Sequence, residues 1–108
     1  MENDKKVEVR EWLRHNKNDS PFASNRFDRE EFEECIDDLY KLGIKEILVT
    51  DIYDEEDRIA SEGGEYADIL LVLIPTNKEK ILDFMLKIAK LNTDECDKEG
   101  KYLRLWWD

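Results

Sequence analysis

Two apolar runs in the middle of the chain show the clearest hydrophobic pattern. They span residues 44–53 and 66–75, and both are rich in the branched and aromatic side chains that suit a pleated surface. The second run is apolar at six consecutive positions, which is typical of a strand covered on both faces. Residues 54–65 join the runs and include Gly63 and Gly64, which can adopt the positive φ of a return turn. We therefore predict a hairpin of two strands with a long tip.

The two predicted strands differ in polarity. Glu46, Thr50 and Asp51 interrupt the first strand, which makes it the better candidate for the edge of a sheet. The second strand is expected in the interior of the sheet. Pro75 ends it, because proline has no backbone N–H to donate to a strand ladder.

A first long helix is predicted over residues 28–42. Asp28 is a favourable N-cap, Glu31 completes a capping box, and Gly43 is a typical C-terminal stop. Apolar residues recur with helical spacing between these signals. The side chains expected on the buried stripe are Phe32, Cys35, Ile36, Leu39 and Tyr40.

A second long helix is predicted over residues 76–91. Thr76 and Glu79 form another capping box, and apolar residues again follow with helical spacing. The side chains expected on its buried stripe are Ile81, Leu82, Met85, Ile88 and Ala89.

The remaining segments are shorter. Val9, Trp12 and Leu13 have helical spacing and predict a helix over residues 5–16, although Val7 and Val9 alternate and leave a strand as the alternative. From their composition, the other segments are predicted to be disordered at residues 1–4, a strand at 22–27, a polar loop at 92–100 and a last strand at 101–107.

The order of these elements predicts the fold. Strand, helix, strand, strand, helix, strand, after a short first helix, is the order of a ferredoxin-like βαββαβ sandwich, an α+β fold with a four-stranded antiparallel sheet and two helices on one face. A chain of 108 residues is expected to form one domain. Folding at this size hides roughly 65% of the surface of the unfolded chain, which suffices for a single two-layer core.

The net charge of −11 is concentrated in the middle of the chain, where residues 28–68 hold four basic and sixteen acidic side chains. Such a field repels nucleic-acid phosphates and anionic lipids and attracts cations. We therefore expect a basic protein partner and neither nucleic acid nor membrane. The simpler alternative is that the excess negative charge only keeps the protein soluble. The candidate partner-binding residues are Glu33, Glu34, Asp37, Asp38, Asp54, Glu55, Glu56 and Asp57.

The densest acidic stretch also suggests a weaker hypothesis, because Mg²⁺ and Ca²⁺ bind through several oxygen ligands. The weak metal candidates are Asp51, Asp54, Glu55 and Asp57. The EF-hand spacing is absent, so a solvated loop tip is the simpler interpretation, and no cofactor is expected.

Other chemistry has little support in the sequence. His15 is the only histidine, Cys35 lies on a predicted buried stripe, and Cys96 stands in an acidic stretch that raises the pKa of a thiol. We expect no catalytic residue, and two free thiols. The lack of a long apolar run or a basic leader predicts a cytoplasmic protein.

Aromatic residues close the chain. One tryptophan of the pair at the end should face the helices and the other the opposite face of the sheet. Either the first helix with Trp12 covers that face, or the face is a surface for a partner or a homodimer. The residues of such an interface are Tyr102, Arg104, Trp106 and Trp107.

Two resemblances accompany these patterns. The order ASNRF, helix, IKEILVTDIYD and GGEYADILLV up to Pro75, with the ending KYLRLWWD, resembles small uncharacterised bacterial proteins. The acidity, size and element order are also similar to the regulator family that inhibits ribonuclease E, without the long acidic tail typical of that family. This second resemblance implies a protein that binds and restrains an enzyme.

The leading hypothesis is a non-enzymatic protein-binding or regulatory module that docks a basic partner through residues 28–68. One alternative is a divalent-metal-binding protein or small metal-dependent enzyme that uses the carboxylates between Asp51 and Asp57. The other is a domain that forms a homodimer.

Overall fold

The computed structural model describes residues 6–16, 29–53, 66–91 and 93–107. Four predicted features lie outside these residues: the disordered start at 1–4, the strand at 22–27, the Asp28 cap and the acidic tip at 54–65. Among the described residues, no helix has the length and apolar character needed to cross a membrane.

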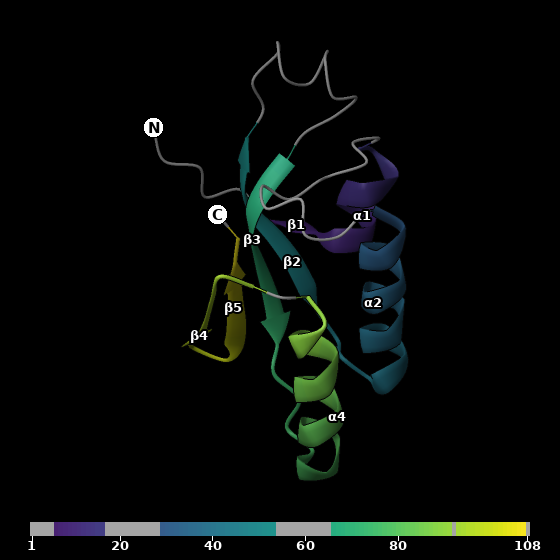
Figure 1. Ribbon diagram of the computed structural model, residues 1–108, viewed down its shortest axis with the longest axis vertical. Helices are drawn as coiled ribbons and strands as arrows, with labels where there is room; N and C mark the ends of the chain where they lie inside the picture. Colours follow the sequence, from purple (N-terminus) through teal and green to yellow (C-terminus); the bar gives the residue numbers. More distant parts are fainter. Residues whose placement is uncertain (1–5, 17–28, 54–65, 92, 108) are drawn as a thin grey trace.

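The described residues form an α+β fold with an open antiparallel sheet of five strands and three helices (Figure 1). The strands follow the order β1-β2-β3-β5-β4 across the sheet. The elements along the chain are β1 (Val7–Glu8), α1 (Val9–Arg14), α2 (Arg29–Leu42), β2 (Ile47–Tyr53), β3 (Tyr66–Leu73), α4 (Lys78–Ala89), β4 (Glu95–Glu99) and β5 (Tyr102–Trp106).

The α+β class and the antiparallel sheet are confirmed, whereas the ferredoxin-like sandwich is not. That fold has four strands, and its first strand lies between the third and the last. Here β3 pairs directly with β5, with Leu70 opposite Leu105. The central place of β3 agrees with its long apolar run.

The start of the chain changes the position of β2. The predicted helix at 5–16 begins only at Val9, because Val7 and Glu8 pair with β2 as a short strand. The prediction that β2 is an edge strand is therefore wrong at Leu48 and Val49, where β1 lies beside it. A Glu8 carboxylate oxygen accepts from the backbone N–H of Glu11 at 2.9 Å and caps α1.

The loop predicted at 92–100 contains a strand, which corrects the sequence interpretation. Residues of β4 pair with β5 from Glu95 opposite Trp106 to Glu99 opposite Tyr102. The connection needs only two residues, because Gly100 takes a φ of 61°, as the first position of a type II′ turn requires. The side chains of β4 are all exposed and mostly charged. Such a composition protects an edge strand from pairing with another chain, and in a sequence it resembles that of a loop.

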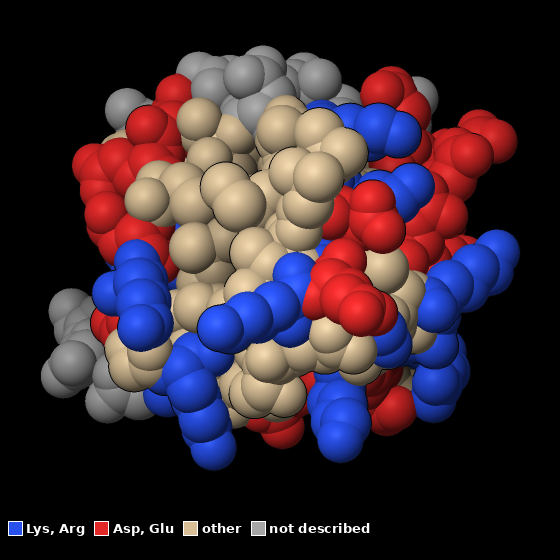
Figure 2. Space-filling model, turned by 90° about the horizontal axis from the view of Figure 1, so that it is seen from below, with Lys and Arg blue, Asp and Glu red and all other residues tan. Residues whose placement is uncertain are grey.

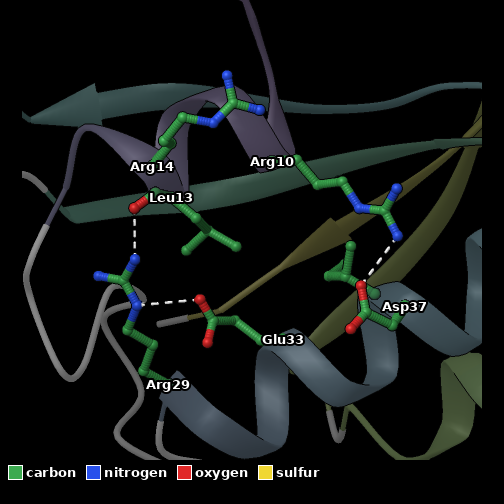
Figure 3. Close-up of a pocket in the computed structure, with 7 residues that line it drawn as sticks. Arg10, Leu13, Arg14, Arg29, Glu33 and Asp37 are labelled. Carbon is green, nitrogen blue, oxygen red and sulfur yellow. Dashed lines mark hydrogen bonds and ion pairs between the residues drawn. The ribbon is translucent and has the colours of Figure 1, made fainter.

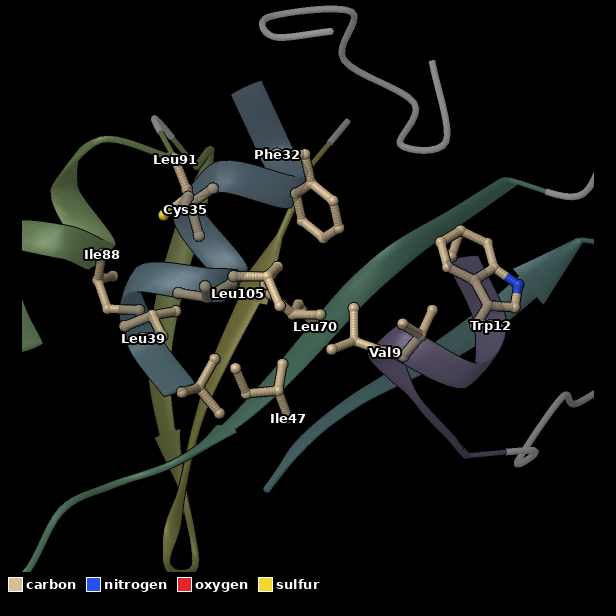
Figure 4. Close-up of a cluster of buried hydrophobic side chains, with 14 of the residues drawn as sticks. Val9, Trp12, Phe32, Cys35, Leu39, Ile47, Leu70, Ile88, Leu91 and Leu105 are labelled. Atoms are coloured by element: carbon tan, nitrogen blue, oxygen red, sulfur yellow. The ribbon is translucent and has the colours of Figure 1, made fainter. Parts of the chain in front are cut away.

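All three helices lie on one face of the sheet and enclose the core with it (Figures 1 and 4). The sheet contributes alternate side chains from β2, β3 and β5, such as Val49, Leu70 and Leu105, each fully buried. Burying each of these side chains stabilises the fold by about 1.5–3 kcal/mol.

Helix α2 follows the prediction closely. Four residues of its predicted stripe are buried and Tyr40 is half-buried. Gly43 ends the helix with a φ of 107°. The N–H of Gly43 donates to the carbonyl of Tyr40 at 3.0 Å and that of Ile44 to the carbonyl of Leu39 at 3.2 Å, which together form a Schellman motif.

Helix α4 departs from the prediction. Asn77 rather than Thr76 is its N-cap, since its side-chain oxygen accepts from the N–H of Glu79 at 2.9 Å. The buried residues of α4 are Phe84 and Ile88. By contrast, the expected core residues Leu82 and Met85 are 67% and 60% exposed, and the neighbouring Leu86 is 57% exposed.

Candidate partner-binding surface on helix α2

Helical geometry separates the four predicted carboxylates of α2 into two pairs. Residues four apart lie on one side of a helix, whereas adjacent residues point about 100° apart. Glu33 and Asp37 therefore face α1, and Glu34 and Asp38 face α4. The sequence prediction had grouped all four on one surface.

The side of α2 that faces α1 is neutralised within the molecule (Figure 3). Arg10 Nη2 lies 2.9 Å from Asp37 Oδ1, and Arg29 Nε lies 3.3 Å from Glu33 Oε1. Arg29 also donates to the backbone carbonyls of Leu13 and Asn16. These contacts tie α1 to α2, so we interpret this side as structural.

Tyr40 strengthens the same junction. The guanidinium of Arg10 stacks over the Tyr40 ring at 4.2 Å from its centre. The Tyr40 hydroxyl donates to the Glu8 carboxylate, and burial together with this contact raises the pKa of Tyr40.

The side of α2 that faces α4 forms an acidic hollow. We use this name for the cavity of about 230 Å³ between α2 and the end of α4, lined by Glu31, Glu34, Cys35, Asp38, Lys90 and Leu91. Its three carboxylates come from successive turns of α2. The C-terminus of α4 adds the partial negative charge of its last carbonyl groups. Asp38 Oδ2 also lies 3.5 Å from Lys87 Nζ.

Small-molecule sites usually enclose about 300–1,000 Å³ and are mainly apolar. The acidic hollow is smaller and lined mostly by charged side chains, so it suits the cationic end of a lysine or arginine side chain better than a metabolite.

The other predicted acidic residues lie in the loop after β2. Asp54, Glu55, Glu56 and Asp57 fall outside the described residues. Asp51 is described, and its φ of 56° is unusual for a residue other than glycine. Within the described ranges, no group of three or more His, Cys, Asp and Glu side chains is placed to hold a metal ion.

The predicted aromatic interface is only partly assembled. Tyr102, Arg104 and Trp106 alternate with the core residues of β5 and share the sheet face opposite the helices. Trp107 instead belongs to the core, and its Nε1 donates to the carbonyl of Leu91 at 3.0 Å. Trp12 is also in the core, so α1 does not cover the opposite face.

Neither cysteine is placed for nucleophilic chemistry. Burial raises the pKa of the Cys35 thiol to about 11, and its Sγ donates to the carbonyl of Lys87. Burial and the neighbouring Asp97 also raise the pKa of Cys96. His15 Nε2 contacts Glu11 Oε1 at 3.1 Å on the exposed surface.

The sequence interpretation missed an apolar groove between α4 and the β4–β5 hairpin. This groove has a volume of about 550 Å³, and its walls include Ile81, Phe84, Met85, Cys96 and Leu103. The paired apolar residues at 81–82 and 85–86 were a usable signal, because they widen the apolar surface of α4 beyond one stripe.

A basic end of the molecule was also missed. Figure 2 shows lysine and arginine side chains around the end that contains the N-terminus of α4. Lys45, Lys80 and Lys101 line a second hollow there, beside Gly43 and Asn77. These lysines come from three separate segments, so the charge of each segment alone does not reveal the cluster.

Comparisons of the chain with protein-family models, curated proteins and solved structures found no match.

Proposed function

We propose that the protein is a non-enzymatic protein-binding module that docks a basic partner through the acidic hollow. The observation that carries this proposal is the convergence of Glu31, Glu34 and Asp38 beside the C-terminus of α4. The other two predicted carboxylates of α2, Glu33 and Asp37, are bound to arginines, whereas Glu34 and Asp38 line the hollow.

The electrostatics favour a lysine or arginine side chain as the docking group. The net charge of −11 attracts a basic protein from a distance and speeds its association. At contact, the carboxylates of the hollow can accept charge-assisted hydrogen bonds, which an arginine guanidinium donates in pairs.

The Asp38–Lys87 ion pair does not block this site. Both side chains are about one third exposed, and exposed ion pairs contribute roughly 0–1 kcal/mol to stability. An incoming arginine can therefore replace Lys87 at little cost. The similarity to an enzyme-restraining regulator family suggests that the partner is an enzyme whose activity falls when it is bound.

The first test is an NMR titration of the protein with an arginine-rich peptide. The backbone amides of Glu31, Glu34 and Lys90 should shift at the lowest peptide concentrations. The double variant Glu31→Gln/Glu34→Gln should bind about 5-fold to 20-fold more weakly, since it removes two charge contacts. Higher salt should reduce the difference, because it screens these charges.

Glu95→Gln/Glu99→Gln is the matched control, because it also removes two negative charges, from exposed positions of β4. It should change the affinity by less than about 2-fold, because no residue of β4 lines the acidic hollow and salt screens exposed charges that make no direct contact with the peptide. Equal losses for the hollow variant and the control would reject the hollow as the docking site. Reversal of Asp54, Glu55, Glu56 and Asp57 tests separately whether the loop contributes.

A further inference from the structure

The outward face of α4 is an apolar surface without a partner among the described residues. Leu82, Met85 and Leu86 are each more than half exposed. Side chains of this size rarely stand together on the surface of a helix unless something binds there. Met85 also lines the groove beside α4, so the exposed residues continue into a larger apolar area.

Charged residues mark the two ends of this face, and the exposed Asp83 borders it on one side. Glu79, Leu82, Leu86 and Lys90 follow one another at intervals of three, four and four residues, which places them on one stripe of the helix. Glu79 and Lys90 are exposed, and neither has an ion pair with another described residue. The stripe is therefore negative at its start, apolar in the middle and positive at its end.

We propose that this stripe binds the same stripe of a second copy of the chain, with the two α4 helices antiparallel. In that arrangement Leu82 and Leu86 of one copy pack against Leu86 and Leu82 of the other. Glu79 of each copy then lies opposite Lys90 of the other, so the pairing of opposite charges occurs twice. A two-fold interface requires such self-complementarity.

The spacing of the stripe fits this geometry. The midpoint between Leu82 and Leu86 falls at position 84, and that between Glu79 and Lys90 falls half a residue later. Half a residue is about 0.75 Å along a helix axis. The leucine contacts and the ion pairs can therefore form in the same register.

A second copy fits this face better than an unrelated helix of one charge. A basic helix would meet Lys90, and an acidic helix would meet Glu79, whereas the antiparallel α4 places an opposite charge at each end. Among the four residues of the stripe, the acidic hollow shares only Lys90, and the leucine contacts of the dimer do not depend on the proposed partner.

Sedimentation equilibrium over a wide concentration range tests the dimer. The wild-type protein should approach twice the mass of one chain as its concentration rises. Leu82→Gln/Leu86→Gln should raise the dimer dissociation constant by about 100-fold, because it removes four apolar side chains from the interface. Trp106→Gln, on the sheet face opposite the helices, should leave the dissociation constant unchanged.

A charge exchange tests the antiparallel register. Glu79→Lys and Lys90→Glu should each weaken the dimer by about 10-fold, because each replaces two attractions with two repulsions. The double variant Glu79→Lys/Lys90→Glu should recover most of the wild-type affinity. Mass is the readout, since Lys90 also lines the acidic hollow.

Three results would overturn the proposal. A wild-type protein that stays monomeric at every concentration has no such interface. A dimer that survives Leu82→Gln/Leu86→Gln uses another surface. If both single charge reversals weaken the dimer and the double variant does not recover its affinity, the antiparallel register is excluded. Circular dichroism should show that each variant keeps its helices, because the four residues are exposed in the monomer and glutamine, lysine and glutamate favour helices.

Discussion

Helices α2 and α4 lie on the same face of the sheet, yet they differ in how much apolar surface the fold covers (Figure 1). In α2, Phe32 and Leu39 are fully buried and the outward side is charged. In α4, Phe84 and Ile88 are buried while three large apolar residues remain exposed. Helix α2 therefore buries its large apolar side chains within the single chain, whereas α4 leaves large apolar side chains exposed.

The difference comes from what lies beside each helix rather than from the helices themselves. Helix α2 covers the middle of the sheet, where its buried stripe packs against side chains of the strands (Figure 4). Helix α1 lies beside α2 and contacts it through the Arg10–Asp37 ion pair. Helix α4 stands beside the short hairpin of β4 and β5, with an open groove between them. Amphipathic spacing predicts a helix in both cases, but it does not show how much of the helix the rest of the chain covers.

The largest expected effect is a contrast in stability between two leucine substitutions. Leu39→Ala should lower the free energy of unfolding by about 2–5 kcal/mol, because it leaves a cavity in the core. Leu82→Ala should change it by less than about 0.5 kcal/mol, because the side chain is mainly exposed. Urea unfolding at a protein concentration low enough to keep the chain monomeric gives both values.

Similar losses for the two variants would contradict the contrast between α2 and α4. A large loss for Leu82→Ala that appears only at high protein concentration would instead support the α4 dimer, since binding to the folded state adds to apparent stability.

The sequence predicted α2 well because its signals are local. The regular apolar stripe and the stop at Gly43 both act within a few residues along the chain. Strands β2 and β3 were predictable for the same reason, since a run of β-branched and other apolar residues by itself indicates a buried strand. Strand β4 was not predictable in this way, because its charged side chains resemble a loop until Tyr102–Trp106 are seen beside it.

The candidate site was predictable in part. The sequence indicated that Glu34 and Asp38 belong to an acidic helix face, but it did not reveal which carboxylates arginines would neutralise. Arg10 comes from a distant segment, and its approach to Asp37 depends on the packing of α1 against α2. The exposed face of α4 was missed, because a stripe of apolar residues is normally assigned to the core.

A smaller effect is expected at Gly43, where the end of α2 meets α4. Gly43→Ala should lower the free energy of unfolding by about 1–2 kcal/mol, because a side chain is unfavourable at positive φ. A Cβ atom there would also lie 2.7 Å from Lys80 Nζ. That atom ends a flexible side chain and can move away, so the backbone should account for most of the loss.

Two further variants separate these causes. Gly100→Ala places a Cβ at a φ of 61° with no heavy atom within 4 Å, and therefore measures backbone strain alone. Adding Lys80→Ala to Gly43→Ala should recover little stability. Recovery of most of the loss would show that contact between the α2 end and α4, rather than the conformation of Gly43, determines the cost.

The smallest expected effect is the pH dependence of the contact that joins α2 to β1 and α1. Burial alone would raise the pKa of the Glu8 carboxyl, but other contacts outweigh it and hold the pKa below its usual value. They are hydrogen bonds from the Tyr40 hydroxyl and two backbone amides, together with the charge of Arg10. A carboxyl with a lowered pKa in the folded state stabilises the fold above its unfolded pKa of about 4.5, and this contribution is lost as the pH falls through the lower, folded value.

Urea unfolding of wild type and Glu8→Gln across this range measures the effect. The wild type should be the more stable at neutral pH, and the difference should shrink as the solution is acidified below about pH 4.5. If the loss in free energy of unfolding caused by Glu8→Gln did not change with pH, Glu8 would hold α2 through the shape of its side chain rather than through its charge. In that case the attachment of α2 to α1 would rest mainly on the Arg10–Asp37 ion pair and on the hydrogen bonds from Arg29 to the carbonyls of Leu13 and Asn16.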